Sequence, residues 1–385
     1  MVLKFAHENN YSGWNKYDAL DSPLLMKLSL GNKYIRLLYS QLIMRSPLNI
    51  RPLFGVPRTR NPKGAALFAM AYLNLYQAEA KKECLDRAEE LLQWLKINSS
   101  KEYPGNCWGY QYPWQDVGFF ARANLPNRVV TYFVATAYLD AYDITGKKEY
   151  MDIATSTVNF MTREPKLLFE SEEMKCISYV PDPQINWIVM DVSALVGSLL
   201  SRLARYAGDQ EMMSEARKFI YFVADKQTDY GAWFYAHPPG DHTKMHDNYH
   251  TGYILDAILD YSENSADDSF MQNYHQGLIY YRDFLFLPDG TPKWMNNKTN
   301  PIDVHGSAQG IITFLKAEKF DKKYYDTAEK IALWTIKNMQ NRKKGYFYYQ
   351  KYFFFKKPFT IMHWSNGWMA RALSMLHRRM NANIY

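Results

Sequence analysis

The sequence predicts an all-α fold, an (α/α)6 barrel in which six helical hairpins close into a ring. Six segments rich in alanine, glycine and aliphatic residues recur along the chain, beginning near Asn61, Pro126, Ile185, His246, Ile302 and Met362. Successive starts lie 65, 59, 61, 56 and 60 residues apart, and amphipathic segments alternate with them. Because one hairpin cannot bury its apolar face alone, we expect the repeats to pack into a single domain that spans residues 1–385.

The six recurring segments are the expected inner helices of the ring. The intervening segments place apolar residues at three- and four-residue steps with charges between them, as outer helices with one solvated face do. Five of these outer helices are expected at 81–96, 147–161, 209–226, 268–286 and 321–339. We predict a sixth outer helix from Pro23 to Met44, interrupted by Gly31.

Short turns join each inner helix to the next outer helix, for example at Thr145 and Gly146, and so make antiparallel hairpins. The return connections are longer and aromatic, at 107–114, 231–238, 290–297 and 345–355. All of them must reach the face at which the inner helices begin. An open helical solenoid is the alternative architecture, but its usual repeat of about 34 to 47 residues is shorter.

Composition narrows the class of protein. Hydrophobic residues make up 47% of the chain and charged residues 22%, and no run of about 18 apolar residues is present, so we expect a globular protein without a membrane span. The N-terminus lacks an apolar signal core. Cys84, Cys107 and Cys176 are too widely spaced for a disulfide framework or a cysteine zinc site, which favours a reducing cytoplasm. The net charge of +7 favours an anionic substrate without requiring nucleic acid.

Several stretches carry a resemblance to known families: 246–258, 290–314, 343–351 and 362–373. They resemble the VpsJ-type proteins encoded in bacterial and archaeal surface-polysaccharide gene clusters, over roughly residues 60–380. More distantly, the chain resembles the six-hairpin glycosidase superfamily, including the unsaturated glucuronyl hydrolases, whose last inner helix carries a W-S-x-G-x-x-W-like stretch. The residues that match it in compressed form are Trp364, Ser365, Gly367 and Trp368. The resemblance implies the barrel fold and a saccharide substrate in surface-polysaccharide metabolism.

The starts of the inner helices gather most of the candidate binding groups. Unpaired N–H groups and positive dipole ends, arranged around one mouth, suit a carboxylate or a sulfate. The polar and aromatic residues at these starts are Asn127, Arg128, Asn186, Trp187, Asp247, Asn248, His250, Asp303, His305, His363, Trp364 and Asn366. Helix capping is the alternative explanation for Asp247, Asp303 and Ser365.

Histidine is the usual proton carrier near neutral pH. His250 and His305 open neighbouring inner helices, and Tyr253 follows His250 by about one turn, so we predict that these residues transfer protons across a bound sugar. Hydrogen bonds to the backbone or to sugar hydroxyls are the alternative role. His246 and His250 also have the spacing of a zinc-binding helix, but His246 falls at the helix start, and we expect no bound metal.

Two reaction classes fit these residues. Glycoside hydrolysis needs two carboxyl groups that flank the scissile bond, and the candidates are Asp247, Asp303 and Asp116, with Asp191 about one turn into its helix. A lyase or C5-epimerase removes a proton beside a uronate carboxylate, which requires a neutralising group and a base. The residues that suit this second chemistry are Asn127, Asn248, His250, Tyr253 and His305.

Aromatic residues, 16% of the chain, can stack on sugar rings at the mouth. The tryptophans in return loops and helix starts are Trp108, Trp114, Trp233, Trp294, Trp364 and Trp368, with packing in the core as the alternative for about half of them. The basic aromatic stretch 341–359 is typical of segments that bind single-stranded nucleic acid or a membrane surface, but its place in the sixth repeat favours a solvated hairpin. The chain has no Gly-rich phosphate loop, so we expect no cofactor and no nucleic-acid partner.

We therefore predict a cytoplasmic carbohydrate-active enzyme that acts on an anionic, uronate-type oligosaccharide or polysaccharide. Hydrolysis ranks first because the distant resemblance implies it, and lyase or C5-epimerase chemistry follows. The alternative to an enzyme is a glycan-binding or assembly protein that uses the same ring of residues without turnover.

Overall fold

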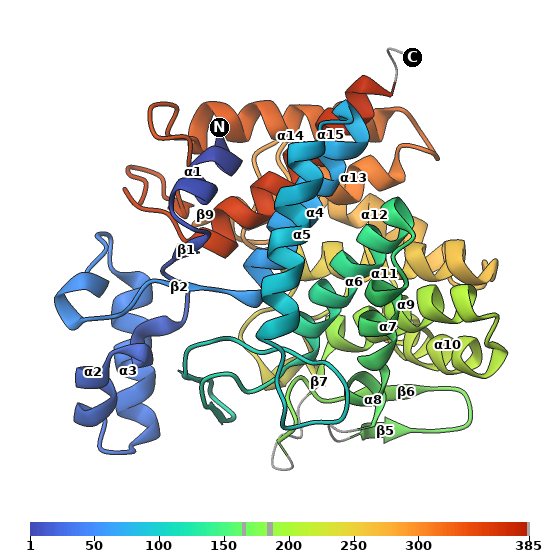
Figure 1. Cartoon of the computed structure of the whole chain (residues 1–385), viewed down its shortest axis with the longest axis horizontal. Helices are drawn as coiled ribbons and strands as arrows, with labels where there is room; N and C mark the ends of the chain where they lie inside the picture. Colours follow the sequence, from blue (N-terminus) through green and yellow to red (C-terminus); the bar gives the residue numbers. More distant parts are fainter. Residues whose placement is uncertain (164–166, 183–187, 383–385) are drawn as a thin grey trace.

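A computed structural model of the chain describes residues 1–163, 167–182 and 188–382. Its inner helices are α4 (Pro62–Glu79), α6 (Arg128–Thr145), α9 (Met190–Ala207), α11 (Asn248–Ser265), α13 (Val304–Ala317) and α15 (Trp368–Asn381). Each packs against the next, and α15 packs back against α4, so the ring is closed (Figure 1). The predicted (α/α)6 barrel is confirmed, and the open solenoid is excluded.

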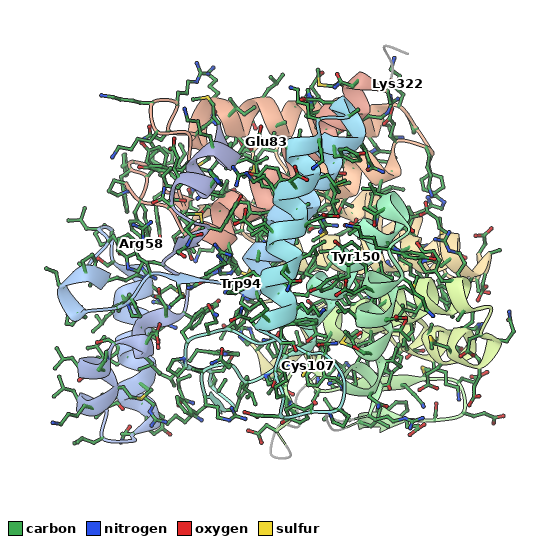
Figure 2. All side chains as sticks on the ribbon, in the orientation of Figure 1. Arg58, Glu83, Trp94, Cys107, Tyr150 and Lys322 are labelled. Atoms are coloured by element: carbon green, nitrogen blue, oxygen red, sulfur yellow. The ribbon has the colours of Figure 1, made fainter. Side chains whose placement is uncertain are left out.

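Outer helices surround this ring: α5 (Lys82–Ile97), α7 (Lys148–Ser156) with α8 (Val158–Thr162), α10 (Gln210–Asp225), α12 (Met271–Leu285) and α14 (Lys323–Met339). Each of α5, α7, α10, α12 and α14 packs on the inner helix that precedes it. At the tight turn after α6, Gly146 has a φ of +66°, a conformation that glycine adopts without strain. Charged residues of the outer layer, such as Glu83 and Lys322, which Figure 2 labels, are exposed.

The sixth outer position belongs to the N-terminal helix α1 (Val2–Glu8), which packs against α15 and against the π-helical turn η4 (Met362–Gly367). The predicted outer helix from Pro23 to Met44 is wrong. That segment forms α2 (Pro23–Leu28) and α3 (Lys33–Arg45), which lie to one side of the ring (Figure 1). Gly31, with φ +74°, separates them, and their buried residues pack in a small cluster of their own, around Ala19, Leu25, Ile43 and Val56.

The return loops form short antiparallel ladders. β7 (Ile188–Val189) pairs with β8 (Ala236–His237), β9 (Ile302–Asp303) with β10 (Gln350–Lys351), and β3 (Trp114–Gln115) with β4 (Phe120–Ala121). Further pairs are β1 (Ser12–Gly13) with β2 (Thr59–Arg60) and β5 (Leu167–Glu170) with β6 (Lys175–Ile177). Short 3-10 turns occupy η1 (Asp18–Asp21), η2 (Arg51–Phe54) and η3 (Pro239–Asp241). Because β7 and β9 run directly into α9 and α13, these ladders fix two helix starts to the loops that surround the mouth.

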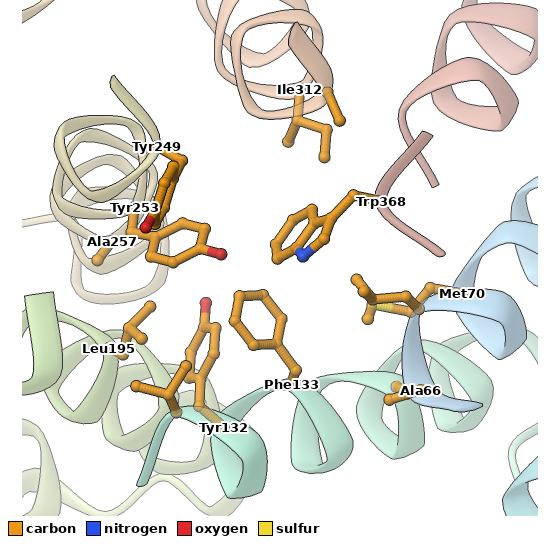
Figure 3. Packing of buried hydrophobic residues seen from close by; sticks show 14 of the residues in the cluster. Ala66, Met70, Tyr132, Phe133, Leu195, Tyr249, Tyr253, Ala257, Ile312 and Trp368 are labelled. Atoms are coloured by element: carbon orange, nitrogen blue, oxygen red, sulfur yellow. The ribbon is translucent and has the colours of Figure 1, made fainter. Parts of the chain in front are cut away.

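The centre of the ring is packed with side chains from all six inner helices. Figure 3 shows Met70, Phe133, Leu195, Tyr253, Ile312 and Trp368 directed toward it. The Phe133 and Tyr253 rings lie 5.0 and 5.5 Å from the Trp368 ring, centroid to centroid, and all three side chains are buried. Within the described residues, no helix is long and apolar enough to cross a bilayer. Side chains therefore fill the barrel below the mouth at which the inner helices begin.

Candidate functional site

A cavity of about 790 Å³ opens at the face where the inner helices begin. The inner helices contribute Lys63, Asp191, His250, Tyr253 and His305 to its lining, and the loops contribute Tyr110, Trp114, Asp116 and Trp294. Residues from α3, among them Leu37, Gln41 and Met44, close one side. A concave site of this volume, largely aromatic with a few converging polar groups, is typical of a small-molecule binding site.

His250 and Asp247 form a hydrogen-bonded pair at the start of α11. Asp247 is the N-cap residue, and its carboxylate oxygen Oδ2 lies 2.6 Å from Nδ1 of His250, one helical turn later. Burial raises the pKa of Asp247, but His250 outweighs burial through its positive charge when it is protonated and through its hydrogen bond, so the pKa of Asp247 is lowered overall. The ionised carboxylate can only accept, so Nδ1 carries the proton, and Nε2 is the ring nitrogen that can take up another.

A second pair joins α11 to α13. The Tyr253 hydroxyl and Nε2 of His305 are 2.8 Å apart, and the Lys63 amine donates to the same hydroxyl at 3.4 Å. Burial, with smaller contributions from Lys63 and Lys16, lowers the pKa of His305 well below its usual value, so the imidazole is neutral. Among the described residues, Nδ1 of His305 has no hydrogen-bond partner.

The Tyr249 ring connects the two pairs. Its centroid lies 4.2 Å from that of His250 and 4.4 Å from that of His305, on which it stacks with an interplanar angle of 10°. The two predicted histidines therefore both pack against the Tyr249 ring at the same cavity wall. The structure thus brings His250, His305 and Tyr253 together, as the positions of their helices in the sequence suggested.

Two buried lysines in the cavity were missed by the sequence analysis. Nζ of Lys16 lies 3.9 Å from Oδ2 of Asp303 and 3.9 Å from the centre of the Trp364 ring, and it has no hydrogen-bond partner in the described chain. Burial lowers the pKa of Lys16 and of Lys63 to about 7. Both amines can therefore gain or lose a proton near neutral pH. Lys63 could have been found from the sequence, because it is a lysine in the first turn of an otherwise apolar inner helix. No such feature of the sequence marks Lys16.

The candidate carboxyl groups occupy different environments. Asp116 and Asp191 line the cavity, and burial raises the pKa of each. Asp303 lies beneath the lining, where its carboxylate accepts hydrogen bonds from the indole N–H of Trp364 at 2.9 Å, the Gln350 amide at 3.3 Å and the His305 backbone N–H at 3.1 Å. Asp303 is thus a helix cap that also holds the Trp364 ring in place.

The predicted binding residues divide into two groups. Trp114, Trp294 and Trp364 line the cavity, together with tyrosines that the sequence analysis did not single out: Tyr17, Tyr110, Tyr179, Tyr235, Tyr249 and Tyr349. Six lysine and arginine side chains line it against two aspartates, Asp116 and Asp191. This excess of cations favours an anionic ligand, and the aromatic walls suit the flat faces of sugar rings.

The second group lies away from the cavity lining. Trp108 and Trp233 are buried, and their indole N–H groups donate to the carbonyls of Leu95 and Val223. Arg128 donates to the carbonyls of Met161 and Ser178. Other buried residues of this group are Asn127, which caps α6, Asn248 and Asn366, which bond to backbone groups, and His363 and Trp368. Asn186 and Trp187 lie outside the described residues.

His246 also lies away from the cavity lining. Its Nδ1 bonds to the Trp233 carbonyl at 2.8 Å, and its Nε2 lies 3.0 Å from the Tyr230 hydroxyl. Both ring nitrogens are therefore engaged, and His246 and His250 do not form the zinc pair that their spacing allows. In the described part of the chain, no group of three or more histidines, cysteines or acidic residues is placed to hold a metal ion.

Comparison with known proteins places this geometry in a common fold. No family model and no curated relative matches the chain. Among solved structures, it is similar to a cellobiose 2-epimerase from Bacillus thermoamylovorans (15% identity, TM-score 0.61, covering 82% of this chain and 87% of that one). It is also similar to a GH76 α-mannanase from Bacteroides thetaiotaomicron (12% identity, TM-score 0.64, covering 84% of this chain and 87% of that one). A third similar structure is an unsaturated glucuronyl hydrolase specific for heparin (13% identity, TM-score 0.61, covering 87% of this chain and 90% of that one).

These neighbours belong to the six-hairpin glycosidase superfamily. At identities this low, the similarity shows a shared (α/α)6 fold and does not assign a reaction.

Proposed function

We propose that this chain is a carbohydrate-active enzyme that moves a proton at a carbon beside a carbonyl or carboxylate of an anionic saccharide, as an epimerase or lyase does. One observation carries the proposal: two hydrogen-bonded pairs, Asp247 with His250 and Tyr253 with His305, meet at one wall of a cationic aromatic cavity. The solved structures that share the fold include enzymes named as a cellobiose 2-epimerase, a sugar epimerase and a D-mannose isomerase.

In the proposed mechanism, Nε2 of His250 removes the proton from the carbon, and Asp247 stabilises the imidazolium that forms. The electron pair of the C–H bond moves onto the neighbouring oxygen, where the charge of a protonated Lys16 or Lys63 stabilises it. Return of a proton from the Tyr253 hydroxyl, which a protonated Lys63 amine at 3.4 Å can reprotonate, gives the epimer. Loss of a substituent at the next carbon gives an unsaturated product.

Hydrolysis remains a second candidate, and Asp116 and Asp191 favour it. Both carboxyl groups line the cavity, and the raised pKa of each suits a general acid, which must hold its proton near neutral pH. The other two carboxylates suit hydrolysis less. Asp247 bonds to His250, and Asp303 accepts from three donors.

Product analysis in D2O with a panel of uronate oligosaccharides separates these reactions. We expect solvent deuterium at the carbon beside the carbonyl or carboxylate, or the absorbance of an unsaturated uronate. New reducing ends without either signal would instead assign hydrolysis by Asp116 and Asp191.

The His250→Ala variant tests turnover against binding. An enzyme loses turnover while the affinity for the saccharide is largely kept. If neither protein turns over any saccharide of the panel and the variant loses only affinity, the chain is a glycan-binding protein.

We place this activity in the metabolism of surface polysaccharides in the cytoplasm. The resemblance to VpsJ-type proteins supports the pathway. Cys84, Cys107 and Cys176 are not joined by disulfides in the described chain, which fits a reducing compartment.

A further inference from the structure

The α2–α3 projection carries an apolar face that no other part of the described chain covers. Its exposed side chains are Leu24, Leu28, Leu30, Tyr34, Leu38 and Leu42. On α3, Tyr34, Leu38 and Leu42 follow one another at four-residue spacing, so they form one stripe along the helix. The opposite side of α3 buries Ile43 and lends Met44 to the cavity wall. The helix α3 is thus apolar on two sides. One side packs against the rest of the chain, and the other is exposed.

The exposed apolar surface continues beyond the two helices. Leu53, in η2, is 79% exposed, and Phe353 and Phe354, in the loop after β10, are 78% and 92% exposed. The same loop lies against the end of α3, because the amine of Lys357 donates to the Met44 carbonyl at 2.6 Å. The loop that carries Phe353 and Phe354 is therefore anchored to the end of α3, although it comes from a distant part of the sequence. An exposed apolar patch of this extent marks an interaction surface.

Both segments that build this surface are basic. Residues 22–78 contain no aspartate or glutamate, and neither do residues 330–385. The exposed cations of these segments include Lys27, Lys33, Arg45, Lys356 and Arg58, which lies on the blue projection in Figure 2. A second copy of the chain would set cations against cations. An anionic partner with an apolar interior would match both properties of the surface.

We propose that this surface docks on a lipid bilayer that contains anionic headgroups. The leucines of α2 and α3 and the phenylalanines at 353 and 354 enter the boundary between headgroups and acyl chains, and the lysines and arginines bind the headgroups. Because α3 also forms a wall of the cavity, docking sets the site beside the membrane surface. The docking surface does not include the proposed catalytic residues, so membrane binding can be tested independently of the reaction.

Vesicle co-sedimentation of the full chain tests this proposal. We expect the wild type to pellet with vesicles that contain phosphatidylglycerol and to stay in solution with pure phosphatidylcholine, with less binding at high salt. The variant L38E/L42E removes two exposed leucines of the stripe and should lower the bound fraction at least about tenfold. The variant F353S/F354S should also lower the bound fraction, and it leaves α3 unchanged.

Leu333, on the outer helix α14, is 63% exposed and provides the matched control. The L333E variant should bind vesicles as the wild type does. The proposal is overturned if the wild type fails to bind anionic vesicles, or if L38E/L42E and F353S/F354S bind like L333E. It is also overturned if light scattering shows a wild-type dimer that L38E/L42E abolishes, because the surface would then be an interface between copies.

Discussion

Replacing Asp247 by asparagine tests the proton-transfer chemistry most directly. The side chain keeps its size, but the amide can donate to Nδ1 of His250, 2.6 Å from the original carboxylate, and so favour the tautomer with the proton on Nε2. Nε2 then cannot act as a base. The imidazolium formed during turnover also loses its ionised partner.

The expected size of the effect follows from that contact. A hydrogen bond to a charged acceptor contributes about 1.5–3 kcal/mol, and the lost charge raises the total to about 2–4 kcal/mol. This corresponds to a fall in kcat of about 30- to 1000-fold. KM should change little, because Asp247 lies behind His250 and does not line the cavity.

The assay is the rate of deuterium uptake into a uronate saccharide, followed by NMR. The control is Asp209→Asn, because Asp209 caps the outer helix α10 through the Met212 N–H and has no part in the cavity. We expect Asp209→Asn to retain the wild-type kcat. A kcat for Asp247→Asn within about twofold of the wild type, or an equal loss in both variants, would refute the role of the pair.

Three further predictions concern other contacts. Tyr253→Phe removes the hydroxyl that bonds to His305 and should lower kcat about 10²-fold, as measured by the same NMR assay. Burial lowers the pKa of Lys63 from 10.5 to about 7. Between these two pH values the unfolded chain binds more protons than the folded chain, so the free energy of unfolding rises with pH. Lys63→Met should therefore have a higher free energy of unfolding than the wild type at pH 7. Urea unfolding should show this difference shrinking by on the order of 2 kcal/mol between pH 7 and pH 9. Asp18→Asn leaves the buried Arg51 guanidinium without its carboxylate at 2.7 Å and should cost about 3 kcal/mol, read from the urea midpoint.

Each of these outcomes has a matched comparison. Tyr34→Phe, at an exposed tyrosine on α3, should leave kcat unchanged, and an equal loss in Tyr253→Phe and Tyr34→Phe would argue against the hydroxyl. A stability difference between Lys63→Met and the wild type that stays constant from pH 7 to pH 9 would show that Lys63 is charged throughout. An unchanged urea midpoint for Asp18→Asn would mean that the other acceptors of Arg51 suffice.

The ring of helices was predictable because the sequence patterns that specify it are local and recur in each repeat. Apolar periodicity and turn residues recur in every hairpin, so the starts of α11 and α13 were predicted to within a few residues. His250 and His305 both lie in the first turn of neighbouring inner helices, and the closed ring brings them to the same cavity. The helix α1 was not predicted as the sixth outer helix, since its seven residues are too few for a clear periodicity.

The composition of the cavity was less predictable for a physical reason. Whether a loop tryptophan faces the cavity or the core depends on tertiary packing. Trp108 and Trp114 belong to the same loop, yet only Trp114 lines the cavity. Lys16 lies far from Asp303 in sequence and reaches it only because the N-terminal segment folds over the mouth. The capping alternative described Asp303 correctly, since its carboxylate accepts from the His305 backbone.

The packing of α1 on α15 has a consequence for how this molecule is made. The helix α1 packs on α15, about 360 residues later in the sequence, so α1 stays unpaired during folding until that last inner helix is available. Contacts of such long sequence separation also slow folding. Lys16 follows α1 closely, and its carboxylate partner Asp303 lies in the fifth inner hairpin. The Lys16 amine therefore reaches its place in the cavity only after the fifth inner helix has folded.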